Sequence, residues 1–328
     1  MIDSNNNKNK IYLKFYKNIG TGTDVNKPDH FFHFIWGYFL PSLNWILSNE
    51  SSARENRENK IYYLRSCGPL MDKIFDEIFP LFDINYQIQK EKTLDQSDLP
   101  KIFIPRWDVI LNIKWQYILN RKTRWRFNIW FKRFWDNISF SNRHYILRTR
   151  KFKKEFFQKI NDTENAILSK IGTFPPNPYL DKYIDQYVIL KRSEEPDHYK
   201  KGVGEAEEKT YGTGRRALTG IEEASKILMK KGTPVQIFEP GICSLRDQIN
   251  VFRRCKGIIF IKGAECTLMN WMKPGSKVIM IWPESIDYLP LQRNMAKFFN
   301  LEYHEIVTGP NLYPKLEPDV IYKLIAPH

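Results

Sequence analysis

Residues 257–281, GIIFIKGAECTLMNWMKPGSKVIMI, decide the fold of the C-terminal half of this 328-residue chain. Two apolar runs, 257–261 and 277–281, flank a turn of small residues and a short segment, 267–272, that we expect to be helical. Runs that are apolar throughout are typical of strands in a parallel sheet that helices cover on both faces. The stretch therefore predicts a strand–helix–strand unit of an α/β domain.

The same alternation extends upstream of this stretch. Apolar runs predict strands at 186–192 and 235–238, and amphipathic spacing predicts helices at 221–231 and 245–255. Ser244 is the expected N-cap of the second helix, because its hydroxyl can accept a hydrogen bond from a free backbone N–H. Strands that alternate with helices in this way predict a Rossmann-like domain.

The N-terminal half shows a second α/β pattern. Strands are expected at 61–66 and 101–105, with an amphipathic helix at 70–79 between them. An apolar helical segment is expected within 24–47. This half is therefore also predicted to be an α/β domain, of the Rossmann-like type.

A break in the pattern divides the two halves. The sequence GTFPPNP at 172–178 combines Gly and three Pro residues, which end helices and mark linkers. The simplest division gives an N-terminal domain over 1–175 and a C-terminal domain over 176–328.

The composition is that of a globular protein, with 42% hydrophobic and 27% charged residues. No run approaches the roughly 18 to 20 apolar residues of a membrane span, and the polar residues 1–10 do not resemble a signal peptide. We therefore expect a cytoplasmic protein, and the Asn-, Lys- and Ile-rich composition would suit a microbial enzyme or a viral one in the host cytoplasm. The cysteines have no CxxC spacing, so free thiols are expected rather than a disulfide framework or a zinc site.

One segment holds most of the positive charge. Residues 113–159 contain fourteen Lys or Arg and two acidic residues, which is +12 of the net charge of +14, and they are dense in aromatic residues. Three interpretations stay open: a nucleic-acid surface with stacking aromatics, a helix pair on an anionic membrane, or aromatic core with a solvated charged face. We prefer the core, then peripheral membrane contact. Nucleic acid is not expected as a partner, because no nucleic-acid motif is present.

The turn that begins with Gly263 and Ala264 is a candidate phosphate site. It follows a buried strand and precedes a helix, so small residues and free backbone N–H groups meet at one place. Such turns serve packing at least as often as binding. No GxGxxG or GxxxxGK[ST] pattern occurs, so neither a dinucleotide fingerprint nor a Walker-type NTPase is supported.

Several elements of residues 186–285 occur together in a recognisable order. In this order they are Lys191-Arg192 at a strand end, Arg215-Arg216, Phe238-Glu239-Pro240, Asp247-Gln248, the turn Gly263-Ala264-Glu265-Cys266-Thr267-Leu268-Met269-Asn270, and Lys273-Pro274-Gly275-Ser276. The stretch resembles the C-terminal half of glycosyltransferase family 61, the family of the EGF-domain O-GlcNAc transferase and of plant xylan xylosyl- and arabinosyltransferases. Near the N-terminus, His33-Phe34 stands where that family often has a His-(Phe/Trp) element that opens a helix.

The chain departs from the family pattern at three places. The turn after Gly263 is stretched by about one residue and lacks its usual His. Thr219 stands where an Arg-x-x-Asn element would have its Asn. Gly37 stands four residues after His33, where an Asp is common.

The resemblance implies a GT-B fold, in which two Rossmann-like domains face a cleft. It places the nucleotide-sugar donor in the C-terminal domain and packs the last helix back on the N-terminal domain. It implies an inverting transfer to a glycan hydroxyl without an obligatory metal or other cofactor. We expect a UDP-linked donor, with UDP-xylose as the best guess. The alternative function is a non-enzymatic protein that binds nucleic acid or an anionic membrane through residues 113–159.

A metal-free transferase has to neutralise the departing diphosphate with Arg or Lys side chains and a helix N-terminus. Arg192 is expected in this role, although a solvated strand end explains it equally well. Glu239 is expected to bind the ribose hydroxyls. The predicted donor-binding residues are Arg192, Arg216, Glu239, Gln248, Gly263, Ala264, Glu265, Cys266 and Thr267, and plain packing is the competing interpretation for Gln248 and Cys266.

Inversion by direct displacement also needs a general base for the acceptor hydroxyl. Asp29, His30 and His33 are the candidates. His33 ranks first because it opens the apolar helix, and Asp29 ranks second. A packed, hydrogen-bonded His is the competing interpretation for His33. Asp108, in a loop after a predicted strand, ranks third, and a turn or N-cap role is the interpretation that we prefer for it.

Overall fold

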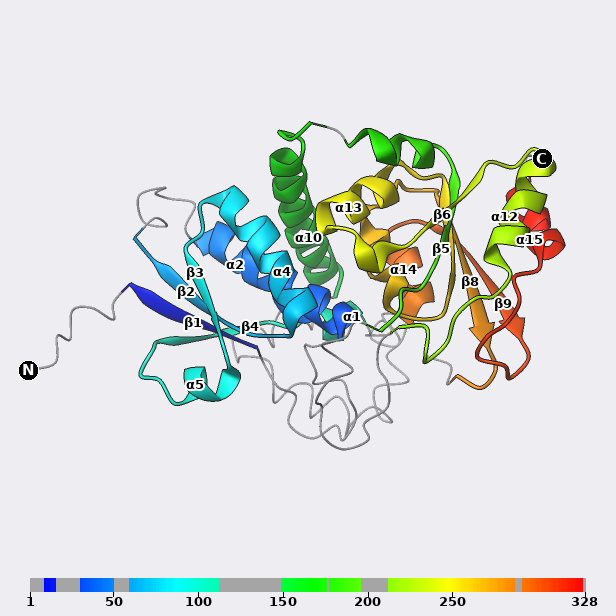
Figure 1. The fold of residues 1–328 in the computed structure, drawn as a ribbon. Coiled ribbons are helices and arrows are strands. Elements are labelled where there is room, and N and C mark those ends of the chain that lie inside the picture. Colours follow the sequence, from blue (N-terminus) through cyan, green and yellow to red (C-terminus); the bar gives the residue numbers. More distant parts are fainter. Residues whose placement is uncertain are drawn as a thin grey trace, which may run out of the picture. The chain divides into compact units, whose positions relative to one another are not determined.

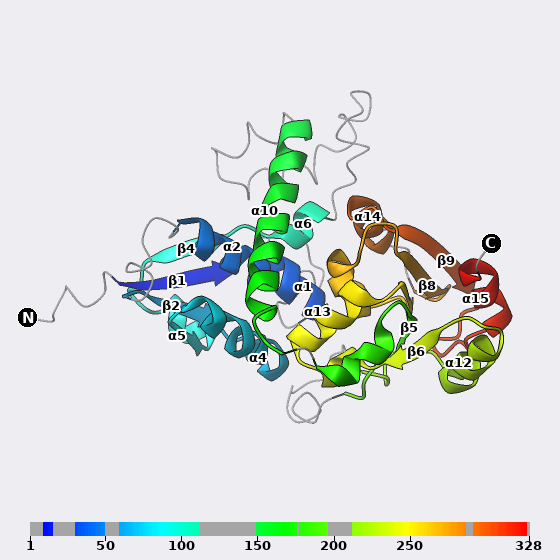
Figure 2. The ribbon, with the colours of Figure 1, turned by 90° about the horizontal axis from the view of Figure 1, so that it is seen from above.

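The computed structural model describes residues 9–15, 30–49, 59–111, 149–175, 177–195, 212–286 and 291–326. The chain divides into an N-terminal unit, Met1–Phe174, and a C-terminal unit, Pro175–His328, close to the predicted break. Each unit contains a parallel sheet with helices packed on it (Figure 1, Figure 2). Most of the basic segment 113–159 lies outside the described residues, so the three interpretations of it stay predictions. No helix of the described ranges is long and apolar enough to cross a membrane.

The N-terminal unit is built on a four-stranded parallel sheet of order β3-β2-β1-β4. The strands are β1 (Lys10–Phe15), β2 (Ile61–Arg65), β3 (Tyr86–Gln89) and β4 (Lys101–Ile104). β2 and β4 confirm the two predicted strands, whereas β1 and β3 were not predicted. Their sequences, KIYLKF and YQIQ, mix charged or amide side chains with apolar ones over too few positions to stand out from loop sequence.

Helices from distant parts of the chain cover one face of this sheet (Figure 1). They are α1 (Phe31–Phe34), the π-helical η3 (Ile35–Phe39) and α2 (Leu40–Asn49), which form one continuous run, α4 (Pro69–Ile78) and the 3-10 turn η4 (Phe79–Phe82). α10 (Thr149–Ile171) packs against α2, and α6 (Trp107–Leu111) against η3. Phe75 lies at the centre of the packing, with its ring 5.2 Å from that of Phe34 and 5.0 Å from that of Phe79. The predicted apolar helix is thus confirmed, and it begins at Phe31.

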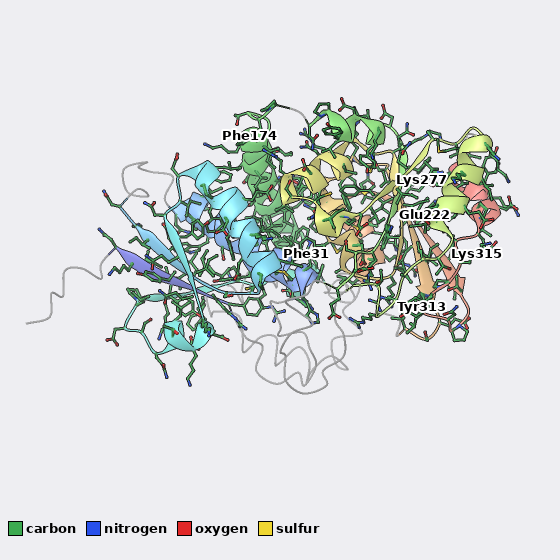
Figure 3. The ribbon with its side chains drawn as sticks, in the orientation of Figure 1. Phe31, Phe174, Glu222, Lys277, Tyr313 and Lys315 are labelled. Carbon is green, nitrogen blue, oxygen red and sulfur yellow. The ribbon has the colours of Figure 1, made fainter. Side chains whose placement is uncertain are left out.

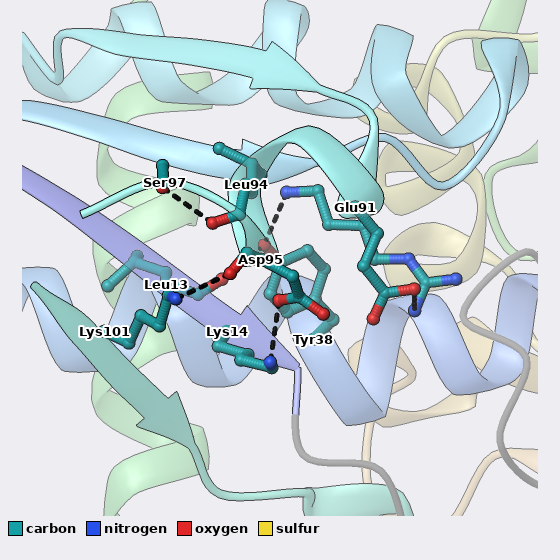
Figure 4. Close-up of polar contacts among 9 residues, drawn as sticks. Leu13, Lys14, Tyr38, Glu91, Leu94, Asp95, Ser97 and Lys101 are labelled. Carbon is teal, nitrogen blue, oxygen red and sulfur yellow. Dashed lines mark hydrogen bonds and ion pairs between the residues drawn. The ribbon is translucent and has the colours of Figure 1, made fainter. Parts of the chain in front are cut away.

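The other face of the sheet carries the short helix α5 (Glu91–Asp95). Lys14 Nζ lies 2.7 Å from Asp95 Oδ1, and Lys101 Nζ donates to the Asp95 carbonyl oxygen over 2.9 Å (Figure 4). The buried Tyr38 hydroxyl, from η3, donates to a backbone carbonyl of β1 over 2.7 Å. Polar contacts therefore fix β1 to the helices around it, which holds its carboxyl end in place.

The C-terminal unit is built on a five-stranded parallel sheet of order β6-β5-β7-β8-β9. The strands are β5 (Tyr187–Leu190), β6 (Val235–Phe238), β7 (Gly257–Ile261), β8 (Lys277–Pro283) and β9 (Glu302–Thr308). The first four confirm predicted strands. β9 was not predicted, because this edge strand, EYHEIVT, has polar residues at most positions.

Helices cover both faces of the C-terminal sheet, as its apolar strands predict. α12 (Ile221–Lys230) packs on β6, while α13 (Leu245–Arg254) and α14 (Leu291–Phe298) each pack against the 3-10 helix η8 (Ala264–Trp271). The 3-10 turns η6 (Pro178–Tyr183) and η7 (Pro240–Ile242) complete the unit. Ser244 caps α13 as predicted, because its side chain accepts a hydrogen bond from the Asp247 N–H over 3.0 Å.

The last helix, α15 (Pro318–Ile325), packs against α12 within the C-terminal unit. Its buried residues Ile321 and Ile325 join the core that α12 forms with the sheet. The segment before it is held by Tyr313, whose hydroxyl donates to the Gly214 carbonyl oxygen over 2.9 Å (Figure 3). The apolar face of α15 thus packs within the C-terminal unit, and the expected return of this helix to the N-terminal domain stays a prediction.

Candidate functional site

The strand order of each sheet reverses at one point. In the C-terminal sheet, β6 lies on one side of β5 and β7 on the other, so the chain leaves β5 in one direction and later returns to its opposite side. In the N-terminal sheet, β2 and β4 lie on the two sides of β1 in the same way. Ligands of parallel α/β sheets bind outside the carboxyl ends of the strands at such a reversal point. These two places are therefore where candidate functional residues are sought.

Arg192 and Glu265 meet at the reversal point of the C-terminal sheet. Arg192 follows β5, Glu265 lies in η8 after β7, and Arg192 Nε donates to Glu265 Oε1. Both side chains are largely buried, with 9% and 11% exposed. Within the described residues, the other carboxylate oxygen of Glu265 has no hydrogen-bond partner. A β-carbon at Gly263 would collide with both side chains, so glycine is what lets them approach the turn.

Arg216 adds a second guanidinium to this place. Its carbonyl oxygen accepts a hydrogen bond from Arg192 Nη1 over 3.4 Å, and its own buried Nε has no hydrogen-bond partner in the described part of the chain. Burial and the positive charges of Arg192 and Arg215 lower the pKa of Arg216 to about 10. Arg216 stays protonated at neutral pH, but its charge is poorly compensated. The arrangement therefore favours a bound anion.

The turn residues after Gly263 serve the turn itself. Cys266 is buried, and its Sγ contacts the Gly263 carbonyl oxygen at 3.2 Å. Burial, and the charge of Glu265, raise the pKa of the Cys266 thiol, so it stays neutral. The buried Thr267 hydroxyl donates to the Ala264 carbonyl oxygen. The side chains of Cys266 and Thr267 thus hold the shape of the turn, and its backbone is left to face a ligand.

Glu239 and Gln248 lie beside the neighbouring strand β6. Gln248 is buried, and its Nε2 donates to the Cys243 carbonyl oxygen over 3.1 Å, so it holds the segment that follows β6. Glu239 begins that segment, and its Oε2 lies 4.0 Å from Lys191 Nζ. The structure therefore brings Arg192, Arg216, Gly263 and Glu265 together, and places Glu239 at the next strand end.

Two residues near this site were not predicted. Ser193 follows Arg192, and its buried hydroxyl has no hydrogen-bond partner among the described residues. Lys262, directly after β7, is buried with its Nζ 4.9 Å from the centre of the Trp282 ring. Their positions immediately after predicted strands were the available signal, since strand ends at a reversal point are where ligands bind.

His33, Asp108 and Arg106 meet at the reversal point of the N-terminal sheet. His33 Nδ1 lies 2.7 Å from Asp108 Oδ2, and Arg106 Nε donates to Asp108 Oδ1 over 3.0 Å. A second nitrogen of Arg106, Nη2, donates to Asp108 Oδ2. Asp108 is fully buried, Arg106 is nearly so, and the His33 side chain is 17% exposed. The imidazole is therefore the member of this group that solvent reaches.

The partners of Asp108 determine its charge. Burial alone would raise the pKa of this carboxyl, but hydrogen bonds from His33 and Arg106, and the Arg106 charge, outweigh it and hold the pKa below its ordinary value. An ionised carboxylate only accepts hydrogen bonds, so His33 must donate from Nδ1. In the neutral imidazole this leaves the lone pair on Nε2, where it can accept a proton. Asp108 is therefore neither an N-cap nor a turn residue; it orients His33.

Gly37 allows this approach. It lies in the π-helical η3, and a β-carbon there would stand 3.1 Å from Asp108 Oδ1 and 3.2 Å from the Phe15 ring. Contacts of that length require the neighbours to move. The chain has this glycine where the family commonly has an Asp, and the carboxylate beside it comes from Asp108.

The other two candidates for the general base are Asp29 and His30. Asp29 lies outside the described residues. His30 is the N-cap residue of α1, with its ring 6.1 Å from that of His33. Within the described ranges, no three His, Cys, Asp or Glu side chains form a group that could hold a metal ion. All four cysteines are free thiols, and Cys67, Cys255 and Cys266 are buried.

A known protein family matches most of the chain. The family described as Glycosyltransferase 61 matches residues 31–279. No curated protein matches the sequence. The matched range contains both reversal-point groups, from His33 in α1 to Glu265 in η8.

Proposed function

The chain belongs to glycosyltransferase family 61, and from this premise we propose that it is an inverting glycosyltransferase that takes its sugar from a nucleoside diphosphate donor. The acceptor is a hydroxyl group of a glycan. The donor that we propose is UDP-linked, with xylose as the sugar. The sugar rests on the family resemblance and not on a contact in the structure.

The uncompensated positive charge beside the C-terminal sheet is the observation that carries the proposal. Arg192 donates to Glu265 and to the Arg216 carbonyl oxygen, and the Arg216 charge is close enough to both side chains to be affected by them. A diphosphate would supply the missing negative charge, and guanidinium groups bind phosphate oxygens with two parallel hydrogen bonds. Such groups also stabilise the charge that develops on the diphosphate as it leaves the sugar. We propose that they do this without an obligatory metal ion.

The N-terminal unit supplies the base in this proposal. His33 Nε2 removes the proton from the acceptor hydroxyl while the oxygen attacks the anomeric carbon. A carbon–oxygen bond forms on one side of the sugar, and the bond to the diphosphate breaks on the other, so the configuration inverts. Asp108 holds the Nδ1 proton and stabilises the imidazolium that results. The GT-B arrangement of the two units, with the donor on one and the base on the other, is part of the proposal.

A binding panel tests the donor site. Thermal unfolding is measured with UDP, GDP, CMP, UDP-xylose and UDP-GlcNAc, each in EDTA and in Mg²⁺ or Mn²⁺. We expect a UDP compound to stabilise the protein in EDTA, by roughly 2.7 kcal/mol at a concentration 100 times its Kd. Arg192→Ala should abolish this shift. Arg254→Ala is the matched control, because this arginine pairs with Asp181 at the far end of α13.

The outcomes separate the parts of the proposal. Stabilisation that requires Mg²⁺ would refute metal independence and leave the donor site standing. Absence of any nucleotide effect would refute the donor site itself. Stabilisation by UDP-GlcNAc in preference to UDP-xylose would correct the sugar.

A further inference from the structure

A pocket of about 630 Å³ lies in the N-terminal unit, between α4 and β3 and at the carboxyl end of β2. Its volume is within the roughly 300 to 1,000 Å³ that is typical of small-molecule sites. β3 is an edge strand, and β2 separates it from β1, the strand at which the order reverses. The pocket therefore lies outside both groups of residues at the reversal points.

Two carboxylates on α4 are held in place beside this pocket. Asp72 accepts hydrogen bonds from the Ser66 hydroxyl over 2.6 Å and from the Cys67 N–H over 2.8 Å. Asp76 lies one helical turn later on the same face of α4, and its Oδ1 accepts a hydrogen bond from the Tyr86 hydroxyl over 2.6 Å. These partners come from the segment after β2 and from β3, so three elements fix both carboxylates before a ligand binds.

The polar side chains of the pocket can both donate and accept further hydrogen bonds. A carboxylate can accept about four hydrogen bonds, and the contacts within the protein use two of these on Asp72 and one on Asp76. The oxygen of Tyr86 can accept from a ligand, because its hydrogen is donated to Asp76. Gln89 adds a carboxamide that donates and accepts, and Lys90 adds an ammonium group that donates. Such a mixture suits hydroxyl groups, since each hydroxyl is both a donor and an acceptor.

The pocket also has an apolar wall on β3. Tyr86 and Ile88 are two positions apart on this strand, so their side chains point to the same side of the sheet. The Tyr86 ring is held by the Phe79 ring, with the two ring centres 5.4 Å apart. A ligand that presents C–H groups on one side and hydroxyl groups at its rim would complement both parts of the pocket.

The charge of the pocket disfavours the other common classes of ligand. Asp72 and Asp76 would repel a phosphate, sulfate or carboxylate, and Lys90 offsets only one of their two charges. A metal ion is not favoured either, because no group of three His, Cys, Asp or Glu side chains is found in the part of the chain that the structure describes. A neutral ligand with several hydroxyl groups, which is a sugar, fits these observations best.

The pocket and the proposed base are connected through the same edge of the sheet. Arg65 ends β2, and its N–H donates to the Tyr38 hydroxyl over 3.0 Å. Tyr38 follows Gly37, and Gly37 lies beside Asp108. Adjacent strands are about 4.8 Å apart, so β3 lies about 10 Å from β1. A glycan whose reacting hydroxyl is at His33 would therefore reach the pocket through further sugar units.

We propose that this pocket binds a neutral sugar unit of a glycan chain. Asp72 and Asp76 accept hydrogen bonds from its hydroxyl groups, Lys90 donates to them, and the Tyr86 ring packs against the C–H groups. The inference rests on the proposed function in one respect, because that function makes the chain the acceptor and the bound sugar a unit that does not react. The acceptor is then an oligosaccharide rather than a single sugar.

A glycan array and calorimetric titration test this assignment. Asp76→Ala removes an exposed carboxylate and no core packing. Asp98→Ala is the matched control, since it removes the same charge from another exposed position of this unit and does not line the pocket. Each protein is applied to an array of neutral, amino-sugar and uronate-containing oligosaccharides, and the neutral oligosaccharide that binds most strongly is then titrated. UDP is titrated separately as a probe of the proposed donor site.

Neutral oligosaccharides should bind the unaltered protein, and Asp76→Ala should weaken their binding by roughly 10- to 100-fold, as expected for lost hydrogen bonds to a charged group. UDP affinity should stay unchanged in Asp76→Ala, and Asp98→Ala should bind both ligands as the unaltered protein does. Glycan affinity within twofold of the unaltered protein in Asp76→Ala would overturn the assignment. A preference for amino sugars or uronates, or no glycan binding at all, would overturn it as well, while UDP binding would leave the proposed donor site standing. Glycan binding that depends on Asp76 in a protein that does not bind UDP would support the pocket and overturn the proposed function.

Discussion

Replacement of Asp108 by Asn is the sharpest test of the proposed base. The carboxamide has nearly the shape of the carboxylate, but it cannot accept all three hydrogen bonds that Asp108 accepts, one from His33 Nδ1 and two from Arg106. Where the amide nitrogen faces His33, Nδ1 has to accept instead of donate, and the His33 tautomer is no longer fixed with its lone pair on Nε2. A positioned general base contributes a factor of roughly 10² to 10⁴, and we expect kcat to fall within that range. The corresponding barrier increase is about 3 to 5 kcal/mol.

The assay has to separate catalysis from folding. Removal of one partner from a buried ion pair costs about 3 to 5 kcal/mol of stability, and Arg106 is nearly fully buried beside Asp108. Rates are therefore measured well below the midpoint of thermal unfolding, which is determined for each variant. Donor affinity serves as the second readout. It should be unchanged, because the proposed donor site belongs to the C-terminal unit.

A double-mutant cycle decides whether Asp108 acts through His33. His33→Ala alone should abolish most of the transfer. If Asp108 only orients His33, Asp108→Asn should have almost no further effect on kcat in the His33→Ala background, as residues that act as one unit are not additive. Effects on kcat that multiply in the double variant would refute this reasoning and give Asp108 a separate role.

Three further predictions concern the same two sites. Arg192→Lys should weaken UDP binding by about tenfold in calorimetry, because an ammonium cannot bind phosphate oxygens with two parallel hydrogen bonds, and full retention of affinity would contradict that geometry. Gly37→Ala should lower the unfolding free energy by roughly 1 to 3 kcal/mol in denaturant titration, since the new methyl group would stand 3.1 Å from Asp108 Oδ1. An unchanged midpoint would mean that the π-helical segment moves enough to accommodate the methyl group. The lowered pKa of Asp108 contributes stability that is present above its unfolded-state pKa of about 3.9 and is lost as the pH falls through the lower folded-state pKa. The difference in unfolding free energy between the unaltered protein and Asp108→Asn should therefore shrink below about pH 4, and a constant difference down to pH 2 would contradict the assigned charge.

The sequence predicted the C-terminal sheet well because its central strands are apolar throughout. β7 and β8 are buried on both faces, so nearly all of their residues are apolar and each strand appears in the sequence as one uninterrupted apolar run. β1 and β3 carry charged or amide side chains on one face, and β9 carries charged side chains on both, so these strands did not stand out from polar segments. Their existence depends on pairing with strands far away in the sequence, which local patterns do not encode.

Site residues that directly follow a predicted strand were predicted better than residues whose partner is distant in the sequence. Arg192, Gly263 and Glu265 follow strands that were predicted, and the family resemblance singled them out. Asp108 was undervalued because it lies 75 positions from His33, and only the parallel pairing of β4 with β1 brings the two segments together.

The two reversal points differ in how a carboxylate compensates the charge of the arginines beside it. In the N-terminal unit, Asp108 neutralises the Arg106 charge through two hydrogen bonds and also accepts one from His33, the base in our proposal. In the C-terminal unit, Glu265 pairs with Arg192, and the positive charges of Arg215 and Arg216 lie nearby. Two unit charges 4 Å apart interact by about 4 kcal/mol at the effective dielectric constant near a protein surface, so one unpaired arginine is enough to direct an anion to one unit and not the other. In our proposal, the position of the carboxylate relative to the arginines, rather than the fold, therefore accounts for donor binding in the C-terminal unit and proton transfer in the N-terminal one.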